Sequence, residues 1–253
     1  MRKIDVNCMI GNSVSQEYAI NTEQQFLEAL DYFRIDQAIA YHATARRMNP
    51  IIGNERLLAL ARTSDQIIPC FILSPHYKYD MGWNALELLL QEQQIKFAKI
   101  FPKEQGFTLH GSHTRELFDI AARNNIHMLI DQSEIVDASG TELECFEALL
   151  RNYPTVTVIL TSIRHRRKMV MYSYFEQYPN FYTEFSVYDN WLAYEEAVRL
   201  FGSHNLLWGS NMPINMPGAA ITMLTYAQID SNDKENIAFR NANRLIGGEL
   251  PCS

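Results

Sequence analysis

The chain opens with the unit that decides its fold: KIDVNCMI (residues 3–10) is followed by TEQQFLEALDYF (residues 22–33). The first stretch is rich in the β-branched and apolar residues that are typical of a strand. In the second stretch, apolar residues recur at helical spacing: Phe26, Leu27, Leu30 and Phe33. Thr22 and Gln25 have the spacing of a capping box, which predicts the start of a helix there. The unit is therefore a strand followed by a helix.

The same alternation continues to the end of the chain. Further strands are predicted near residues 35–43, 66–75, 95–102, 126–131, 156–162, 180–187 and 204–213, each followed by a helical pattern, for example near 54–64, 83–93 and 167–177. Eight such units fit the length of a (β/α)8 barrel, whereas a doubly wound sheet is the competing architecture. No glycine-rich phosphate loop follows any strand, which disfavours a nucleotide-binding doubly wound fold. We predict one α/β domain over residues 1–253, a TIM barrel with an extra C-terminal helix that ends at Gly247.

Composition excludes several classes of partner. The chain has 22 Lys and Arg against 29 Asp and Glu, a net charge of -7, which disfavours nucleic acid. No apolar run approaches the roughly 20 residues that span a bilayer, so no membrane partner is predicted. The four cysteines (Cys8, Cys70, Cys145 and Cys252) form no CxxC pair and no signal peptide precedes them, so a reduced, cytoplasmic setting is expected. The oligomeric state stays open, a homo-oligomer included.

Four segments, each after the expected strand, carry a family resemblance. They are KIFPKEQGFTL (99–109), YPNFYTEFS (178–186), LLWGSNMP (206–213) and NANRLIG (241–247). Together with IDVNCMIG (4–11) they make nearly the whole chain resemble the amidohydrolase superfamily. The similar branch is the amidohydrolase-related one, which includes carboxymuconate-semialdehyde decarboxylases and pyrone-dicarboxylate lactonases. The resemblance implies a hydrolase of a metal-dependent superfamily.

The chain departs from this family at the positions that the resemblance associates with the metal. The His-x-His of the first strand falls on Asn7 and Met9, the strand-five His on Asp131, the strand-six His on Ser162 or close to it, and the strand-eight Asp on Asn211. Side chains at i and i+2 of a strand face one side, which is why such a pair can share a metal. An amide and a thioether are poor ligands for zinc or manganese. We therefore predict no metal site and no cofactor.

Three residues are candidates for catalysis. Asp131 and Glu184 are carboxylates at the ends of strands five and seven, and His42 ends strand two. If Asp131 points inward and is partly desolvated, its pKa would rise and it could act as a general base. The alternative is that Asp131 pairs with a nearby Lys or Arg and only holds the barrel mouth together. Asn211 cannot replace the strand-eight Asp that activates water in the metal-free lactonases of this branch.

A second group of residues is predicted to contact a ligand: Asn7, Met9, His76, Lys99, Ser162, Arg164, Arg46 and Asn211. Lys99 occupies the family's strand-four lysine position, with a buried salt bridge as the alternative role. Five histidines are expected at the mouth (His42, His76, His110, His113 and His165), but for each taken singly a hydrogen-bonded loop residue is the favoured explanation. His127 and His204 begin strands and belong to the opposite face.

Two basic segments, ARR (45–47) and RHRRK (164–168), are expected in loops at the ligand face. A solvated surface explains part of such a run. Cations gathered at one end of an acidic protein also suggest a small anionic, carboxylate-bearing ligand that at least two arginines contact.

Three functions remain open. The first is a metal-free hydrolase, with lactonase- or decarboxylase-like chemistry on a small carboxylated molecule. The second is a catalytically inactive pseudoenzyme that binds such a molecule or partners an active relative. The third is an enzyme whose metal site is rebuilt from histidines.

Overall fold

The computed structural model describes residues 1–11, 18–137 and 139–247, so Cys252 lies outside the described residues. Eight parallel strands pair in chain order: β1 (Ile4–Ile10), β2 (Gln37–His42), β3 (Ile67–Ile72), β4 (Phe97–Ile100), β5 (His127–Asp131), β6 (Val158–Thr161), β7 (Phe181–Glu184) and β8 (Leu206–Leu207). Backbone hydrogen bonds join the last strand segment to the first: Val6 N donates to Trp208 O at 3.0 Å and Met9 N to Met212 O at 2.8 Å. The predicted (β/α)8 barrel is confirmed.

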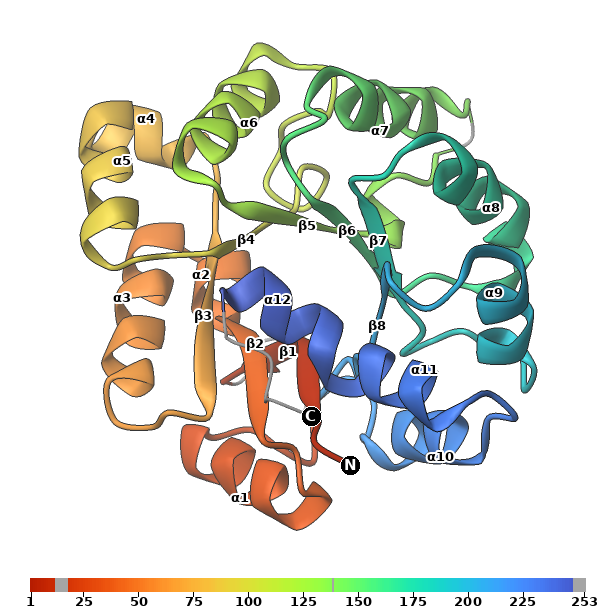
Figure 1. Ribbon diagram of the computed structural model, residues 1–253. Coiled ribbons are helices and arrows are strands. Elements are labelled where there is room, and N and C mark those ends of the chain that lie inside the picture. Colours follow the sequence, from red (N-terminus) through yellow and green to blue (C-terminus); the bar gives the residue numbers. More distant parts are fainter. Residues whose placement is uncertain (12–17, 138, 248–253) are drawn as a thin grey trace.

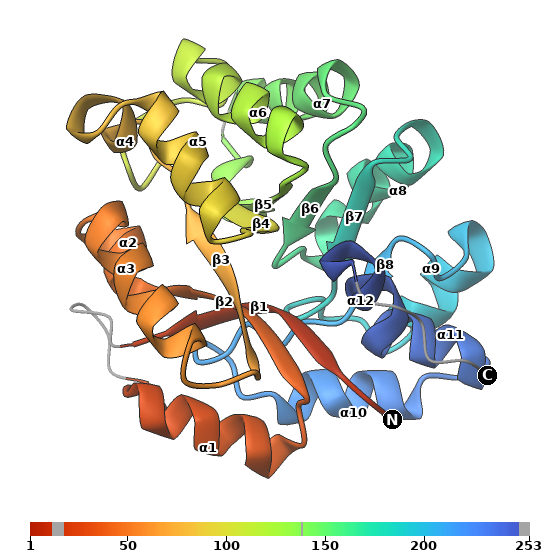
Figure 2. The ribbon, with the colours of Figure 1, turned by 60° about the vertical axis from the view of Figure 1, so that its left-hand side comes forward.

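Helices surround this ring of strands (Figures 1 and 2). They are α1 (Glu23–Phe33), α2 (Ala43–Arg47), α3 (Pro50–Ala61), α4 (His76–Asp80), α5 (Trp83–Glu92), α6 (Ser112–Asn124), α7 (Thr141–Asn152), α8 (Lys168–Gln177), α9 (Ala193–Phe201) and α10 (Gly218–Tyr226). The predicted capping box of α1 is present, because Thr22 and Gln25 exchange both hydrogen bonds. No helix in the described part of the chain is long and apolar enough to cross a membrane.

The C-terminal segment closes the barrel at the end where the strands begin. It runs as α11 (Ser231–Glu235), a π-helical turn η3 (Asn236–Arg240) and α12 (Asn241–Ile246), and α12 crosses the ring of strands in Figure 1. His127, the first residue of β5, has its Nε2 3.0 Å from Leu245 O. Gly247 ends the segment with φ 87°, the left-handed conformation that favours glycine. The extra helix is confirmed, although a π turn interrupts it.

The segment after β2 differs from the prediction. ARR (45–47) was expected in a loop, but it lies in the short helix α2, and α3 begins at Pro50, four residues before the predicted start. His42 caps α2 by accepting a hydrogen bond from Thr44 N at 3.1 Å. Asn49 caps α3 by accepting from Ile51 N and Ile52 N. Asn followed by Pro is a helix-start signal, so the boundary of α3 was readable from the sequence.

Gly53 allows α3 to pack directly against α2. A Cβ at Gly53 would lie 2.0 Å from Ala45 N, a backbone atom that cannot yield without moving α2. We expect Gly53→Ala to lower the free energy of unfolding by about 1–3 kcal/mol, as overpacking does. Urea unfolding measures the change.

Gly218→Ala is the matched control, because a Cβ added at Gly218 would have Phe33 Cε1, 4.0 Å away, as its nearest neighbour. Its stability should stay at or slightly above that of the wild type, since alanine is favoured over glycine in a helix. Equal stability of both variants would show that α2 and α3 are not tightly packed.

Candidate functional site

A pocket of about 520 Å³ opens at the carboxyl ends of β5, β6, β7 and β8, where ligands meet barrels of this kind. We call it the mouth pocket. Its lining comes from the ends of four strands and from α2: Arg46, Asp131, Gln132, Ser133, Val136, Ser162, Arg164, Arg166, Arg167, Val187, Asn211, Ile214 and Asn215. The volume is in the range of small-molecule sites.

Positive charge dominates this lining, with four arginines against the single carboxylate of Asp131. Three of the arginines come from one segment, Arg164 and the turn η2 (His165–Arg167) after β6. No ion pair within 4.0 Å joins Arg164, Arg166 or Arg167 to any residue of the described chain. Their guanidinium groups therefore stand at the pocket without a neutralising carboxylate in ion-pair contact.

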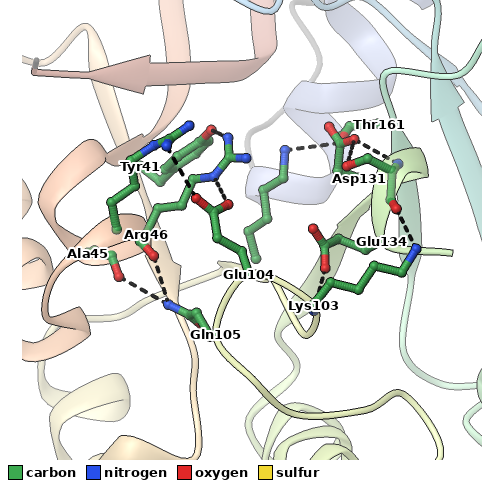
Figure 3. A network of polar contacts seen from close by, with 12 residues as sticks. Tyr41, Ala45, Arg46, Lys103, Glu104, Gln105, Asp131, Glu134 and Thr161 are labelled. Atoms are coloured by element: carbon green, nitrogen blue, oxygen red, sulfur yellow. Dashed lines mark hydrogen bonds and ion pairs between the residues drawn. The ribbon is translucent and has the colours of Figure 1, made fainter. Parts of the chain in front are cut away.

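Arg46 is held differently, by three protein groups, of which Figure 3 shows Glu104 and Tyr41. Its Nε lies 2.5 Å from Glu104 Oε2, its Nη1 donates to Tyr41 Oη at 3.2 Å, and its guanidinium carbon lies 4.2 Å from the centre of the Phe101 ring. A guanidinium has five N–H donors, and these contacts use two of them. Arg46 is thus a fixed cation with donors to spare, and 16% of its side chain is exposed.

Residues 103–105, which follow β4, tie two walls of the mouth pocket together (Figure 3). On one side, Glu104 contacts Arg46, and Gln105 Nε2 donates to the carbonyl oxygens of Ala45 and Arg46 at 3.2 Å each. On the other side, Lys103 Nζ donates to Ser133 O at 2.7 Å and to Val136 O at 2.5 Å. The segment thereby fixes α2 relative to η1 (Gln132–Glu134) without lining the pocket itself.

Asp131, the last residue of β5, lines the pocket but does not have the raised pKa that a desolvated base would need. Its Oδ1 accepts hydrogen bonds from Ser133 N at 3.0 Å and Ser133 Oγ at 2.8 Å. Burial raises the pKa of Asp131, but the Lys99 charge and the Ser133 bonds outweigh burial and hold it below its usual value. The predicted rise in pKa is wrong, because the charge of Lys99 stabilises the ionised carboxylate.

Beneath the pocket, the Asn7 amide links two buried titratable side chains, Lys99 and Glu184. Lys99 Nζ donates to Asn7 Oδ1 at 2.9 Å, and Asn7 Nδ2 donates to Glu184 Oε1 at 3.0 Å. The reverse orientation of the amide would place its donors against the ammonium and its oxygen against the carboxylate. The two neighbours therefore determine which way the Asn7 amide points.

Glu184 is fully buried, with 0% exposed, and it does not line the mouth pocket. Besides Asn7, its carboxylate accepts from Ser162 N at 2.6 Å, from Ser186 Oγ at 3.0 Å and from Ser186 N. Burial raises the pKa of Glu184, while the hydrogen bonds from Ser162 and Ser186 lower it in part. A Cβ at Gly209 would lie 3.0 Å from this carboxylate, so the backbone also encloses it.

Two residues of the pocket have the left-handed backbone conformation: Ser162 with φ 58° and Asn211 with φ 60°. Among the residues that the structure describes, the other three non-glycine residues with positive φ (Arg34, Gln94 and Asn125) follow the ends of helices. Backbone in this region costs energy and is often retained at functional sites. Here it turns the chain sharply after β6 and again at Asn211; β8 itself has two residues where ten were predicted.

The remaining predicted site residues lie outside the mouth pocket. Met9 and Lys99 are buried in the barrel, and His76 is exposed with its Nδ1 2.7 Å from Ser74 Oγ. His42 faces a separate surface hollow beside Glu23, and burial together with the charge of Arg56 lowers its pKa to about 4. The structure thus brings together Asp131, Ser162, Arg46, Arg164 and Asn211 from the predicted set.

The other histidines expected at the mouth, His110, His113 and His165, do not line this pocket either. The ring of His113 packs against Tyr79, and that of His165 against Tyr188. Within residues 1–11, 18–137 and 139–247, no group of three or more His, Cys, Asp or Glu is placed to hold a metal ion.

Sequence reasoning missed three polar residues of the lining: Gln132, Ser133 and Asn215. Gln132 Oε1 accepts a hydrogen bond from Arg164 N at 2.8 Å and so joins η1 to the arginine segment. Gln132 directly follows the carboxylate that ends β5, which is the signal that could have identified it. Asn215 lies four residues beyond Asn211 and is brought back by a turn, in which Asn215 N donates to Asn211 O at 3.0 Å.

Comparisons with known proteins agree with this architecture. Similar solved structures include 2,6-dihydroxybenzoate decarboxylase from Rhizobium, with 14% identity, 98% of this chain and 99% of that chain covered, and a TM-score of 0.75. The 5-carboxyvanillate decarboxylase from Sphingomonas paucimobilis has 12% identity, 98% and 99% coverage and a TM-score of 0.74.

A dihydroxybenzoic acid decarboxylase from Polaromonas sp. JS666, with bound manganese and 2-nitroresorcinol, has 12% identity, 97% coverage of both chains and a TM-score of 0.74. At such identities these structures show a shared fold. A search of curated proteins gives no match. A sequence model described as Amidohydrolase matches residues 24–248, and the chain therefore belongs to the amidohydrolase family.

Proposed function

We propose that the mouth pocket binds a small carboxylate-bearing molecule and does so without a divalent metal ion. The observation that carries this proposal is the cluster of Arg46, Arg164, Arg166 and Arg167 around one pocket of an acidic protein. Guanidinium groups recognise carboxylates through paired, charge-assisted hydrogen bonds. The similar solved structures include one complexed with 2,6-dihydroxybenzoate, a ligand of this chemical class.

The residues at the family's metal positions do not fit a divalent cation. Asn7 Oδ1 is an oxygen of the kind that hard cations prefer, but it accepts a hydrogen bond from the Lys99 nitrogen at 2.9 Å. A second cation at this point would be repelled by the first. The Asp131 carboxylate already accepts bonds from Ser133. The proposed binding therefore involves no metal.

Binding without turnover, the pseudoenzyme alternative, is supported by the titratable groups of the pocket. General acid–base catalysis at neutral pH is most efficient with a group whose pKa lies near 7. Asp131, with its lowered pKa, is a weak base, and the other polar groups of the lining are guanidinium, amide and hydroxyl groups. Hydrolase- or decarboxylase-like turnover remains the second candidate, supported by the family to which the chain belongs.

Titration of the protein with 2,6-dihydroxybenzoate tests the proposal, with resorcinol as the matched compound that lacks the carboxylate. We expect 2,6-dihydroxybenzoate or another small carboxylate of a panel to raise the Tm by mass action, and resorcinol to have little effect. Arg164→Ala should weaken binding about 10-fold or more, since a hydrogen bond to a charged group contributes about 1.5–3 kcal/mol. Arg199→Ala, an exposed arginine on α9 outside the mouth pocket, is the control and should bind as the wild type does.

Two further measurements complete the test. Binding should be unchanged after treatment with a chelator, and elemental analysis should find no stoichiometric zinc, manganese or iron in the purified protein. Release of carbon dioxide from the bound carboxylate would favour turnover over binding alone. A carboxylate panel with no effect beyond that of sodium chloride would contradict the proposal.

A further inference from the structure

We propose that the side-chain nitrogen of Lys99 is a permanent internal cation of the barrel, and that the side chains at the strand ends are arranged around it. This inference goes beyond the proposed function, because it concerns how the floor of the site is built, whichever ligand binds above it. Lys99 is 1% exposed and belongs to β4, yet its contacts come from strands on other sides of the barrel.

The geometry around this nitrogen is that of a built cation site. Its Nζ donates to Asn7 Oδ1 of β1 at 2.9 Å and to Thr161 Oγ1 of β6 at 3.0 Å. The rings of Tyr41 and Phe101 have their centres 5.3 Å from Nζ, within the distance at which an aromatic face stabilises a cation. Two oxygens and two aromatic faces thus enclose one nitrogen.

The neighbouring charges favour the protonated form of this amine. Asp131 at the end of β5 and Glu184 at the end of β7 attract a positive charge on Lys99, and Arg46 on α2 is the cation that opposes it. Burial lowers the pKa of Lys99, and Asp131 is the largest of the influences that raise it again. A buried anion with no compensating cation would be costly, which is the reason to expect the charge to remain.

Two side chains, Asn7 and Thr161, lie between Lys99 and the carboxylates of Glu184 and Asp131. Asn7 passes the effect of the charge to Glu184, because the amide accepts from Lys99 and donates to Glu184 Oε1 at 3.0 Å. Thr161 lies between Lys99 and Asp131: its Oγ1 accepts from the nitrogen at 3.0 Å and lies 3.4 Å from Ile130 O and 3.5 Å from Asp131 Oδ2 (Figure 3). Lys99 is therefore a positioning residue, which acts on the pocket through Asp131.

Chemical rescue tests this role. Lys99→Ala removes the fragment that n-propylammonium would replace, whereas 1-propanol fills a similar volume with no charge. We expect the variant to lose roughly 6–20 °C in Tm, the consequence of breaking a buried charge arrangement in a domain of this size. Propylammonium should recover a large part of the loss and propanol little of it. Equal rescue by both compounds would overturn the proposal, because it would assign Lys99 to packing.

The wild-type protein supplies an independent measurement, should Lys99→Ala fail to fold. Titration of the Lys99 side chain by carbon-13 NMR at the carbon bonded to Nζ reports its protonation state. We expect the charged form at pH 7, and a neutral amine at that pH would overturn the proposal. Loss of carboxylate binding in Arg164→Ala together with a neutral Lys99 would refute this inference alone and leave the proposed function standing.

Discussion

Replacing Asn7 with leucine is expected to lower the free energy of unfolding by about 3–5 kcal/mol. The substitution keeps the approximate shape of the side chain but removes one hydrogen bond from Lys99, one to Glu184 and one to Ser162 Oγ. Each bond to a charged group contributes about 1.5–3 kcal/mol, and both charged groups are buried. Chemical denaturation with urea, followed by circular dichroism, gives the difference in the free energy of unfolding.

Two variants control this prediction. Asn84→Leu changes an exposed asparagine of α5 and should stay within about 0.5 kcal/mol of the wild type. Asn7→Asp places a carboxylate oxygen about where the amide nitrogen lies 3.0 Å from Glu184 Oε1, so like charges meet. Its loss of stability should shrink as the pH is lowered, because one carboxyl can then hold a proton. An Asn7→Leu variant as stable as Asn84→Leu would show that the bridge contributes nothing.

The sequence contains most of the information that determines the fold. Apolar runs such as residues 156–162 and 180–187 place the strands correctly, since parallel strands covered by helices are buried on both faces. The start of α2 was missed because five residues are too few to show a helical period, and the cap that begins it is a histidine. The early end of β8, at Leu207, has no signal in the apolar pattern of residues 204–213.

The site was predictable only in part, for a physical reason. Residues at strand ends can be assigned to the barrel mouth, which is how Asp131, Ser162 and Asn211 were identified. Their electrostatic state depends on contacts between distant strands: Lys99 and Asp131 are 32 positions apart in sequence, yet the charge of one sets the pKa of the other. Burial alone would have raised the pKa of this carboxyl.

Arg46 combines a property that the sequence shows, its charge near the mouth, with contacts that only the structure shows. Sequence reasoning identified it as a cation near the mouth, whereas its fixed position results from Glu104, Tyr41 and Phe101, which come from two other segments of the chain. Burial raises the pKa of Tyr41 to about 12, so its hydroxyl stays protonated and presents a neutral oxygen to Arg46. A cation held in this way has lost its side-chain entropy before a ligand arrives, which favours binding.

Arg46→Ala is therefore expected to weaken the binding of a small carboxylate by about 10- to 150-fold, which corresponds to about 1.5–3 kcal/mol. Arg46→Lys should recover little of this loss, because an ammonium cannot contact Glu104, Tyr41 and a ligand with the planar array of donors of a guanidinium. Isothermal titration of each variant with 2,6-dihydroxybenzoate, or with the best carboxylate of the panel, measures the effect.

Arg47→Ala is the matched control, since Arg47 also lies near Glu104, with Nη1 3.6 Å from Oε1, but does not line the mouth pocket. If the pocket recognises the carboxylate directly, Arg47→Ala should bind within about twofold of the wild type while Arg46→Ala does not. Equal losses in the two variants would mean that Glu104 and the shape of α2 matter, and direct recognition by Arg46 would be wrong. If only Arg46→Ala loses affinity and the Tm of both variants is unchanged, the loss reflects a contact between Arg46 and the ligand. A general loosening of α2 would instead lower both the affinity and the stability.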